Sequence, residues 1–102
     1  MRHHVYALKQ AKHPQRPYVL DLQSNLLVDL GTRLVAPLQR RESVDPAEII
    51  DELMPVLNIG GEDFVLFTQE AAAYPVKGLG HAIADLSAHS SRLTGALDRL
   101  TG

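Results

Sequence analysis

Few side chains in this sequence have the types and spacing that metal or nucleophilic chemistry requires. His81 and His89 lie eight residues apart, with Asp85 between them, in a segment expected to be helical. In a helix, these two histidines would be about 12 Å apart at about 1.5 Å per residue, which is too far to share one ion. Cysteine is absent, which excludes disulfides, thiolate nucleophiles and cysteine-ligated zinc. We therefore predict no metal and no cofactor.

Motifs for covalent or phosphate chemistry are also missing. The sequence has no Gly-x-Ser-x-Gly elbow, and Gly78-Leu79-Gly80 lacks the Lys-Ser/Thr that completes a phosphate-binding loop. Asp21, Glu62 and Asp63 could act as an acid pair only if the fold brought them together. We expect no catalytic residues.

Cations gather in two segments. Residues 9–16 contain three cations and a histidine between Tyr6 and Tyr18, while Arg40 and Arg41 form a second group. Aromatic rings beside cations can bind single-stranded nucleic acid, although such a composition is more typical of an exposed loop. Ten Lys and Arg against twelve Asp and Glu give a formal charge of −2. This balance argues against sequence-independent binding to the phosphates of nucleic acid.

The strands and helices that position these residues are expected to form a single domain, residues 1–102. At 45% hydrophobic, the chain can form one core at this length. No apolar run approaches the roughly 20 residues of a membrane helix, and the first residues lack the apolar region of a signal peptide. We expect a small soluble protein of the cytoplasm.

Strands are expected over roughly residues 1–77. Residues 18–23 alternate apolar and polar side chains, which is typical of a half-buried strand. A second strand candidate, residues 33–38, contains Pro37, which favours an edge or a strand end. Gly60-Gly61 joins two apolar runs and predicts a tight hairpin.

Helical signals come later in the chain. Asp45-Pro46-Ala47-Glu48 is a capped helix start, but Pro55 leaves room for only a short helix over 45–53. From His81 onward apolar residues recur at helical spacing, which predicts a helix over roughly residues 81–100. The expected class is mainly β with one C-terminal helix (α+β).

Six blocks, in this order and at nearly constant spacing, resemble the CcdB family of bacterial toxins. They are Val5-Tyr6, Asp21-Leu22-Gln23-Ser24, Arg33-Leu34-Val35-Ala36-Pro37-Leu38, Leu53-Met54-Pro55-Val56-Leu57-Asn58-Ile59-Gly60, Pro75-Val76 with Gly80, and Ile83-Ala84-Asp85-Leu86-Ser87. The resemblance covers nearly the whole chain.

The resemblance implies an SH3-like barrel of the CcdB, Kid and MazF type, with an antiparallel sheet and a homodimeric assembly. It also implies a toxin of a toxin–antitoxin system for plasmid maintenance, which binds the DNA gyrase A subunit and traps its cleaved DNA complex. A cognate CcdA-like antitoxin would neutralise it, and DNA would be contacted only indirectly, through the antitoxin complex. Such a toxin inhibits a topoisomerase by binding and is not an enzyme.

Two surfaces are expected on this basis. The gyrase-facing residues carried over by position are Ser24, Asn25, Leu26, Leu27, Ser90, Ser91, Asp98, Thr101 and Gly102. Leu26 and Leu27 could equally be core residues, because neighbouring strand residues face opposite sides. Flexible acidic antitoxin segments pair with cations, so the expected antitoxin contacts are Lys9, Lys12, Arg16, Arg40 and Arg41.

Three further expectations concern function and assembly. The family ends in Trp-Gly-Ile, whereas this chain ends in Leu100-Thr101-Gly102 and has no tryptophan, so a non-poisoning relative that binds only antitoxin is one alternative. A MazF-like endoribonuclease is another, and it would use Arg33 with Asp21 or Ser24. Dimerisation is expected because the apolar faces of the helix and hairpin exceed what one small sheet can cover.

Overall fold

The computed structural model describes residues 2–23 and 31–101, which form one antiparallel sheet and one α-helix. The strand order is β4-β5-β3-β2-β1-β7, and β6 pairs with β3 beside this path. The bounds are β1 His4–Leu8, β2 Tyr18–Asp21, β3 Thr32–Arg40, β4 Val56–Ile59, β5 Glu62–Leu66, β6 Ala72–Pro75, β7 Leu79–Asp85 and α1 Ser90–Thr101. Short 3₁₀ turns connect them: η2 Arg41–Ser43, η3 Pro46–Glu48, η4 Thr68–Glu70, η5 Val76–Gly78 and η6 Ser87–His89.

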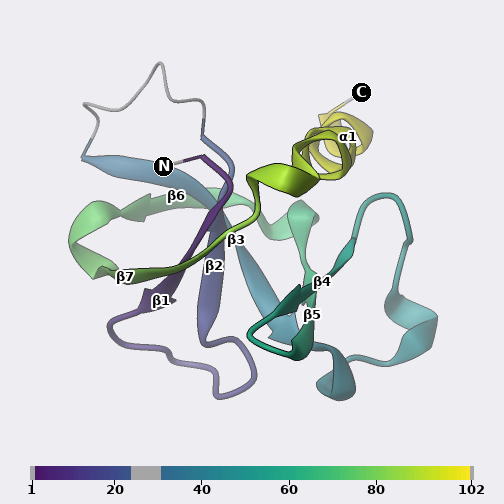
Figure 1. Ribbon diagram of the computed structural model, residues 1–102, viewed down its shortest axis with the longest axis horizontal. Coiled ribbons are helices and arrows are strands. Elements are labelled where there is room, and N and C mark those ends of the chain that lie inside the picture. Colours follow the sequence, from purple (N-terminus) through teal and green to yellow (C-terminus); the bar gives the residue numbers. More distant parts are fainter. Residues whose placement is uncertain (1, 24–30, 102) are drawn as a thin grey trace.

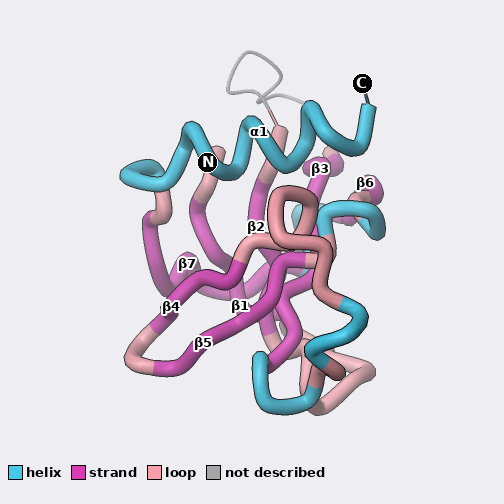
Figure 2. The backbone as a smooth tube through the Cα atoms, turned by 90° about the vertical axis from the view of Figure 1, so that its right-hand side faces the viewer, coloured by secondary structure: helices cyan, strands magenta, loops and turns pink. Residues whose placement is uncertain are grey.

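The long strand β3 curls the sheet into a half-barrel. One edge of β3 pairs with β2, while the other pairs with β6 over residues 32–35 and with β5 over residues 38–40. Two separate strands therefore share one edge, and the sheet bends between them (Figure 1). Helix α1 lies across one end of the curled sheet (Figure 2). This arrangement confirms the expected mainly β class with an SH3-like barrel and a C-terminal helix.

The position expected for Pro37 is wrong, because β3 is a central strand. Leu22 N donates to Leu34 O across the β2–β3 pair, so alternate residues of β3 direct their N–H groups to β2. By this alternation the ring nitrogen of Pro37 faces the other edge, where neither β5 nor β6 pairs with residues 36 and 37. Proline is tolerated there because no ladder hydrogen bond is lost.

Strand β2 is buried on both faces. Leu20 and Leu22 join the main core with Leu38, Phe64 and Leu93. Val19 points to the opposite face, where it packs in a second cluster with Val35 and Leu79. The strand predicted at residues 18–23 is confirmed over Tyr18–Asp21, but it is not half-buried as its alternation indicated.

The hairpin prediction is confirmed. Strands β4 and β5 pair through Ile59 and Glu62, and the two residues between them, Gly60 and Gly61, have φ angles of 61° and 88°. Two consecutive positive φ angles match the turn that a Gly-Gly hairpin favours.

The predicted helix over 81–100 begins too early. Residues 79–85 form strand β7, which pairs with β1, and α1 begins at Ser90. Ile83 and Leu86 are three residues apart, as on one face of a helix. Ile83 is nevertheless an exposed strand residue, and of the two only Leu86 is buried. Pairing with the edge of β1 outweighs the local pattern. The helical segment starts after Asp85, whose Oδ1 accepts from Ser87 N at 2.9 Å.

The segment 45–53 contains one short 3₁₀ helix and a hydrogen-bonded turn over residues 51–53. Asp45 Oδ1 accepts from Ala47 N at 2.9 Å and begins the 3₁₀ helix η3 over Pro46–Glu48, so the predicted cap is present without a longer helix. Within residues 2–23 and 31–101, no helix has the length and apolar character needed to cross a membrane.

His3 joins the start of α1 to the sheet. Its φ angle is 63°, its backbone N donates to Asp21 O at 2.7 Å, and its carbonyl accepts from Leu86 N at 2.8 Å. The ring Nδ1 lies 2.9 Å from Ser90 Oγ. One buried residue therefore holds the end of β2 and the beginning of α1 together.

Beside His3, a buried ion pair links β2 to β3. Arg33 Nε donates to Asp21 Oδ2 at 2.8 Å, with side chains 8% and 0% exposed. The other carboxylate oxygen accepts from Gln23 N at 2.9 Å. Both oxygens are thus satisfied, as a buried charge requires.

We expect Arg33→Met to lower the free energy of unfolding by about 3–5 kcal/mol, because it leaves the Asp21 carboxylate buried without its cation. Urea unfolding followed by circular dichroism measures this change. Arg99→Met is the control, because the Arg99–Glu52 ion pair is exposed and should contribute little. Equal effects of the two substitutions would contradict a structural role for the buried pair.

We also expect stability to fall on acidification through His3. Burial, with Arg2 nearby, lowers the pKa of His3 below its ordinary 6.5, against the opposing charges of Asp21 and Asp85. The unfolded chain then binds the proton more readily, so stability present above pH 6.5 is lost as the pH falls toward the folded pKa. The melting temperature, measured from about pH 7.5 to 5.5, should fall less steeply with falling pH in His3→Asn than in the exposed control His81→Asn. Identical dependence of the melting temperature on pH in both variants would refute the contribution of His3.

Candidate functional site

The outward face of α1 is polar. Ser91 and Asp98 are seven residues apart, about two helical turns, and lie opposite the buried residues Leu93 and Ala96. Both side chains are exposed, as is Thr101, whose Oγ1 donates to Leu97 O at 3.2 Å. These three members of the expected gyrase-facing set therefore lie on accessible positions of one helix.

Ser90, the first residue of α1, makes structural hydrogen bonds within the chain. It is half-buried, its hydroxyl donates to Ser87 O at 2.7 Å, and the same oxygen lies beside His3 Nδ1. Its side chain anchors the helix start to the sheet. The contact with His3 has no signal in the sequence, because 87 residues separate the two in the chain.

The other expected gyrase-facing residues lie outside the described residues. They are Ser24, Asn25, Leu26, Leu27 and Gly102. The residue before this segment, Gln23, is buried, and its Oε1 accepts from Leu34 N at 2.8 Å. The chain thus leaves β2 from a fixed point two residues beyond Asp21, which His3 ties to α1.

A groove runs between α1 and the segment before β4. Its volume is about 420 Å³, and Arg99 Nε contacts Glu52 Oε2 at 3.2 Å on its wall. An adjoining hollow of about 370 Å³ lies between Ile50 and Asp98. Ile50 is 55% exposed there.

The two cationic segments meet at the opposite end of the half-barrel (Figure 1). Arg40 N donates to Gln15 O at 2.9 Å, which joins the loop between β1 and β2 to the end of β3. Arg16 Nε donates to Gln39 Oε1 at 2.7 Å. The fold therefore brings two of the expected antitoxin-contacting residues, Arg16 and Arg40, near one another.

Two of these cations are already paired within the chain. Arg16 makes a bidentate contact with Glu70 at 2.8 and 2.9 Å and stacks over the Phe67 ring. The hydrogen bonds from Arg16 hold the pKa of Glu70 below its ordinary value. Arg40 forms an ion pair with Glu62.

The remaining cations of the set are more available. Arg41 Nη1 donates to Val44 O at 3.2 Å. Lys9 and Lys12 are exposed, and neither makes an ion pair within the described chain. Of the five residues, these two lysines therefore have ammonium groups open to an anionic partner.

The residues considered for catalysis are not arranged as a reactive centre. Asp21 and Arg33 are paired inside the protein, where a scissile phosphate cannot reach them. Glu62 is paired with Arg40, and Asp63 accepts from Asn58 at 3.0 Å, so the three acids do not converge. Ser24 lies outside the described residues.

The two histidines that the sequence predicts on one helix belong to different elements. His81 lies on β7 and His89 in η6, so the helical spacing between them does not apply. Across the described ranges, no group of three His, Cys, Asp or Glu side chains could hold a metal ion.

The apolar faces expected to need a partner are mostly buried in one copy, although Leu100 of α1 is exposed. The apolar residues of the β4–β5 hairpin and the Leu93 side of α1 are buried within one copy of the chain, so they do not demand a partner. The large hydrophobic side chains exposed in the described ranges are Ile50, Val76, Ile83 and Leu100.

Comparison with known protein families identifies the wider group. The model of the CcdB protein family matches residues 2–102, nearly the entire sequence. The match spans the half-barrel, the His3 junction and α1. The chain belongs to the CcdB family, the toxins of toxin–antitoxin systems.

Proposed function

We propose that this protein binds the A subunit of DNA gyrase through α1 and the segment that follows β2. By trapping the cleaved DNA complex it would inhibit the topoisomerase in the bacterial cytoplasm. A CcdA-like antitoxin would neutralise it. Family membership supports the toxin class, and the geometry around His3 supports this particular surface.

The observation that carries the proposal is the junction at His3. Its backbone binds Asp21 at the end of β2, and its ring contacts Ser90 at the start of α1. Two segments far apart in sequence are therefore anchored at one end of the molecule (Figure 1). A partner could contact both at once.

Inhibition would occur by binding and not by bond cleavage. The exposed helix residues Ser91, Asp98 and Thr101 offer hydroxyl groups and a carboxylate to a partner. Among these described residues no aromatic side chain supplies a large buried anchor of the kind that often dominates interfaces. Two copies acting together would compensate for a weak single contact.

We further propose a homodimer that presents two such ends. The exposed side chains of Val76 and Ile83, on η5 and β7, are the apolar residues of the sheet region open to a second copy. The antitoxin would use the opposite, cationic end, where Lys9 and Lys12 are unpaired within the described ranges.

Gyrase supercoiling assays test the proposal with charge reversals. Asp98→Arg, at an exposed helix position, should raise the concentration for half-inhibition by roughly tenfold or more, equivalent to about 1.4 kcal/mol. Glu42→Arg makes the same charge change in η2, at the opposite end of the half-barrel, and should leave inhibition unchanged. Light scattering should give the mass of a dimer for all three proteins.

The wild-type protein must also produce a gyrase–DNA cleavage complex at micromolar concentration. Antitoxin binding without a cleavage complex would replace the proposal with the non-poisoning relative. Equal loss of inhibition in Asp98→Arg and Glu42→Arg would contradict the assigned surface.

A further inference from the structure

A buried histidine holds the first residue of α1. The ring Nδ1 of His3 lies 2.9 Å from Ser90 Oγ, and His3 is 4% exposed. The Ser90 hydroxyl donates its single hydrogen to Ser87 O at 2.7 Å, so its oxygen is left to accept from the ring. The neutral imidazole therefore carries its proton on Nδ1, and this N–H donates to Ser90.

The backbone of His3 keeps the ring beside α1. His3 N donates to Asp21 O at 2.7 Å, and its carbonyl accepts from Leu86 N at 2.8 Å. Its φ angle of 63° lies in the left-handed region, which histidine and asparagine adopt more readily than most residues. The ends of β2 and β7 therefore hold the ring in place from two directions.

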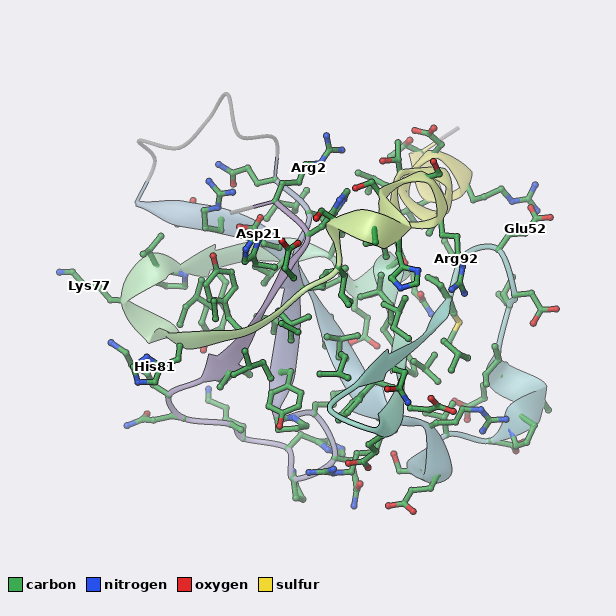
Figure 3. All side chains as sticks on the ribbon, in the orientation of Figure 1. Arg2, Asp21, Glu52, Lys77, His81 and Arg92 are labelled. Atoms are coloured by element: carbon green, nitrogen blue, oxygen red, sulfur yellow. The ribbon has the colours of Figure 1, made fainter. Side chains whose placement is uncertain are left out.

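The charged groups around the ring come from several elements. Arg2 precedes it in the chain, Asp21 ends β2 and Asp85 ends β7. His4 of β1 has its Nε2 3.8 Å from Asp85 Oδ2, and the contact from α1 is the neutral hydroxyl of Ser90. Figure 3 shows Arg2 and Asp21 at the end of the half-barrel where α1 lies. One cation and two acids therefore act on the protonation of the ring.

Both acids are already engaged by other groups. Asp21 Oδ2 accepts from Arg33 Nε at 2.8 Å inside the protein. Asp85 Oδ1 accepts from Ser87 N at 2.9 Å, and this residue is exposed to water. Each acid therefore adds little stabilisation to a positive charge on the ring, while Arg2 repels such a charge.

A ring that left Ser90 for water would bind a proton more readily than the packed ring. Burial, with Arg2 as the second cause, lowers the pKa of the packed His3 below its ordinary 6.5, and exposure restores that ordinary value. The packed arrangement is therefore fully favoured above pH 6.5 and loses its advantage as the pH falls toward the lowered pKa. The ratio of released to packed rings rises by up to about tenfold between about pH 7.5 and 5.5.

We propose that His3 is a pH-sensitive latch on α1: the neutral ring holds Ser90, and the protonated ring leaves it and frees the first turn of the helix. The inference rests on the proposed function, in which α1 carries the gyrase-binding surface, and it adds regulation of that surface by pH. His3 is a positioning residue, because it acts on a partner only through Ser90 and α1.

Hydrogen exchange tests the latch without any partner. In the helical pattern the Thr94 amide donates to the Ser90 carbonyl, so its protection reports on the first turn of α1. After correction for intrinsic exchange rates, this protection should fall by up to about tenfold between about pH 7.5 and 5.5. The Leu20 amide, in the main core, should stay more protected than Thr94 throughout, because release of the turn does not require unfolding.

His3→Asn is the decisive variant. Asparagine tolerates the left-handed backbone, and its amide N–H replaces the Nδ1 donor to Ser90, but it does not titrate. The protection of Thr94 should therefore no longer depend on pH. His4→Asn is the matched control, because its ring faces Asp85 and not α1, and it should retain the pH dependence of the wild type.

A second arm connects the latch with the partner. Calorimetry at about pH 7.5 and 5.5 gives the affinity for the gyrase A subunit, and titration of gyrase itself cancels when two variants are compared. On acidification the wild type should lose affinity by about twofold or more relative to His3→Asn, because fewer molecules hold α1 in place. A ratio of affinities that does not change with pH would contradict regulation of the surface.

Four results would overturn the latch itself. They are equal protection of the Thr94 and Leu20 amides at every pH, the same pH dependence of Thr94 in the wild type and His3→Asn, loss of that dependence in His4→Asn, and titration of the His3 ring C–H signals at or above pH 6.5. The last measurement needs no variant. A protein that never binds gyrase loses the proposed function, while hydrogen exchange still decides the latch.

Discussion

A carboxylate can remain ionised inside a protein only where its charge and hydrogen-bonding capacity are met, and this constraint organises one end of the half-barrel. Asp21 satisfies it with Arg33 and with the backbone of Gln23. The backbone of Asp21 in turn binds His3, whose ring reaches Ser90. Strands β1, β2 and β3 and the start of α1 are thus fixed around one buried charge. The proposed gyrase surface takes its geometry from this junction.

The two-sided burial of β2 and β3 has a second consequence on the reverse face of the sheet. The main core lies on one face with Leu20 and Leu38, and Val19 and Val35 lie on the other. The thinner cover of the reverse face leaves a cavity lined by Val19, Val35 and Lys12.

Local sequence signals predicted the features that depend on neighbours along the chain. Gly60-Gly61 specified its hairpin, and Asp45 its cap, because turn and cap geometry are local. The helix predicted from residue 81 is wrong at its start, because the strand at residues 79–85 depends on pairing with β1, some 75 residues earlier. The His3–Ser90 contact and the cavity beside Lys12 had no sequence signal, since each arises from residues that only the folded sheet brings together. The cations were recognisable from sequence, but the pairing of Arg16 with Glu70 was not.

Amide hydrogen exchange of the protein, free and bound to the gyrase A subunit, tests the central claim most directly. The account predicts that gyrase slows exchange in α1 and in the residues that follow β2, and leaves the loop between β1 and β2 unchanged. Protection confined to that loop or to β6, with α1 exchanging as in the free protein, would contradict it.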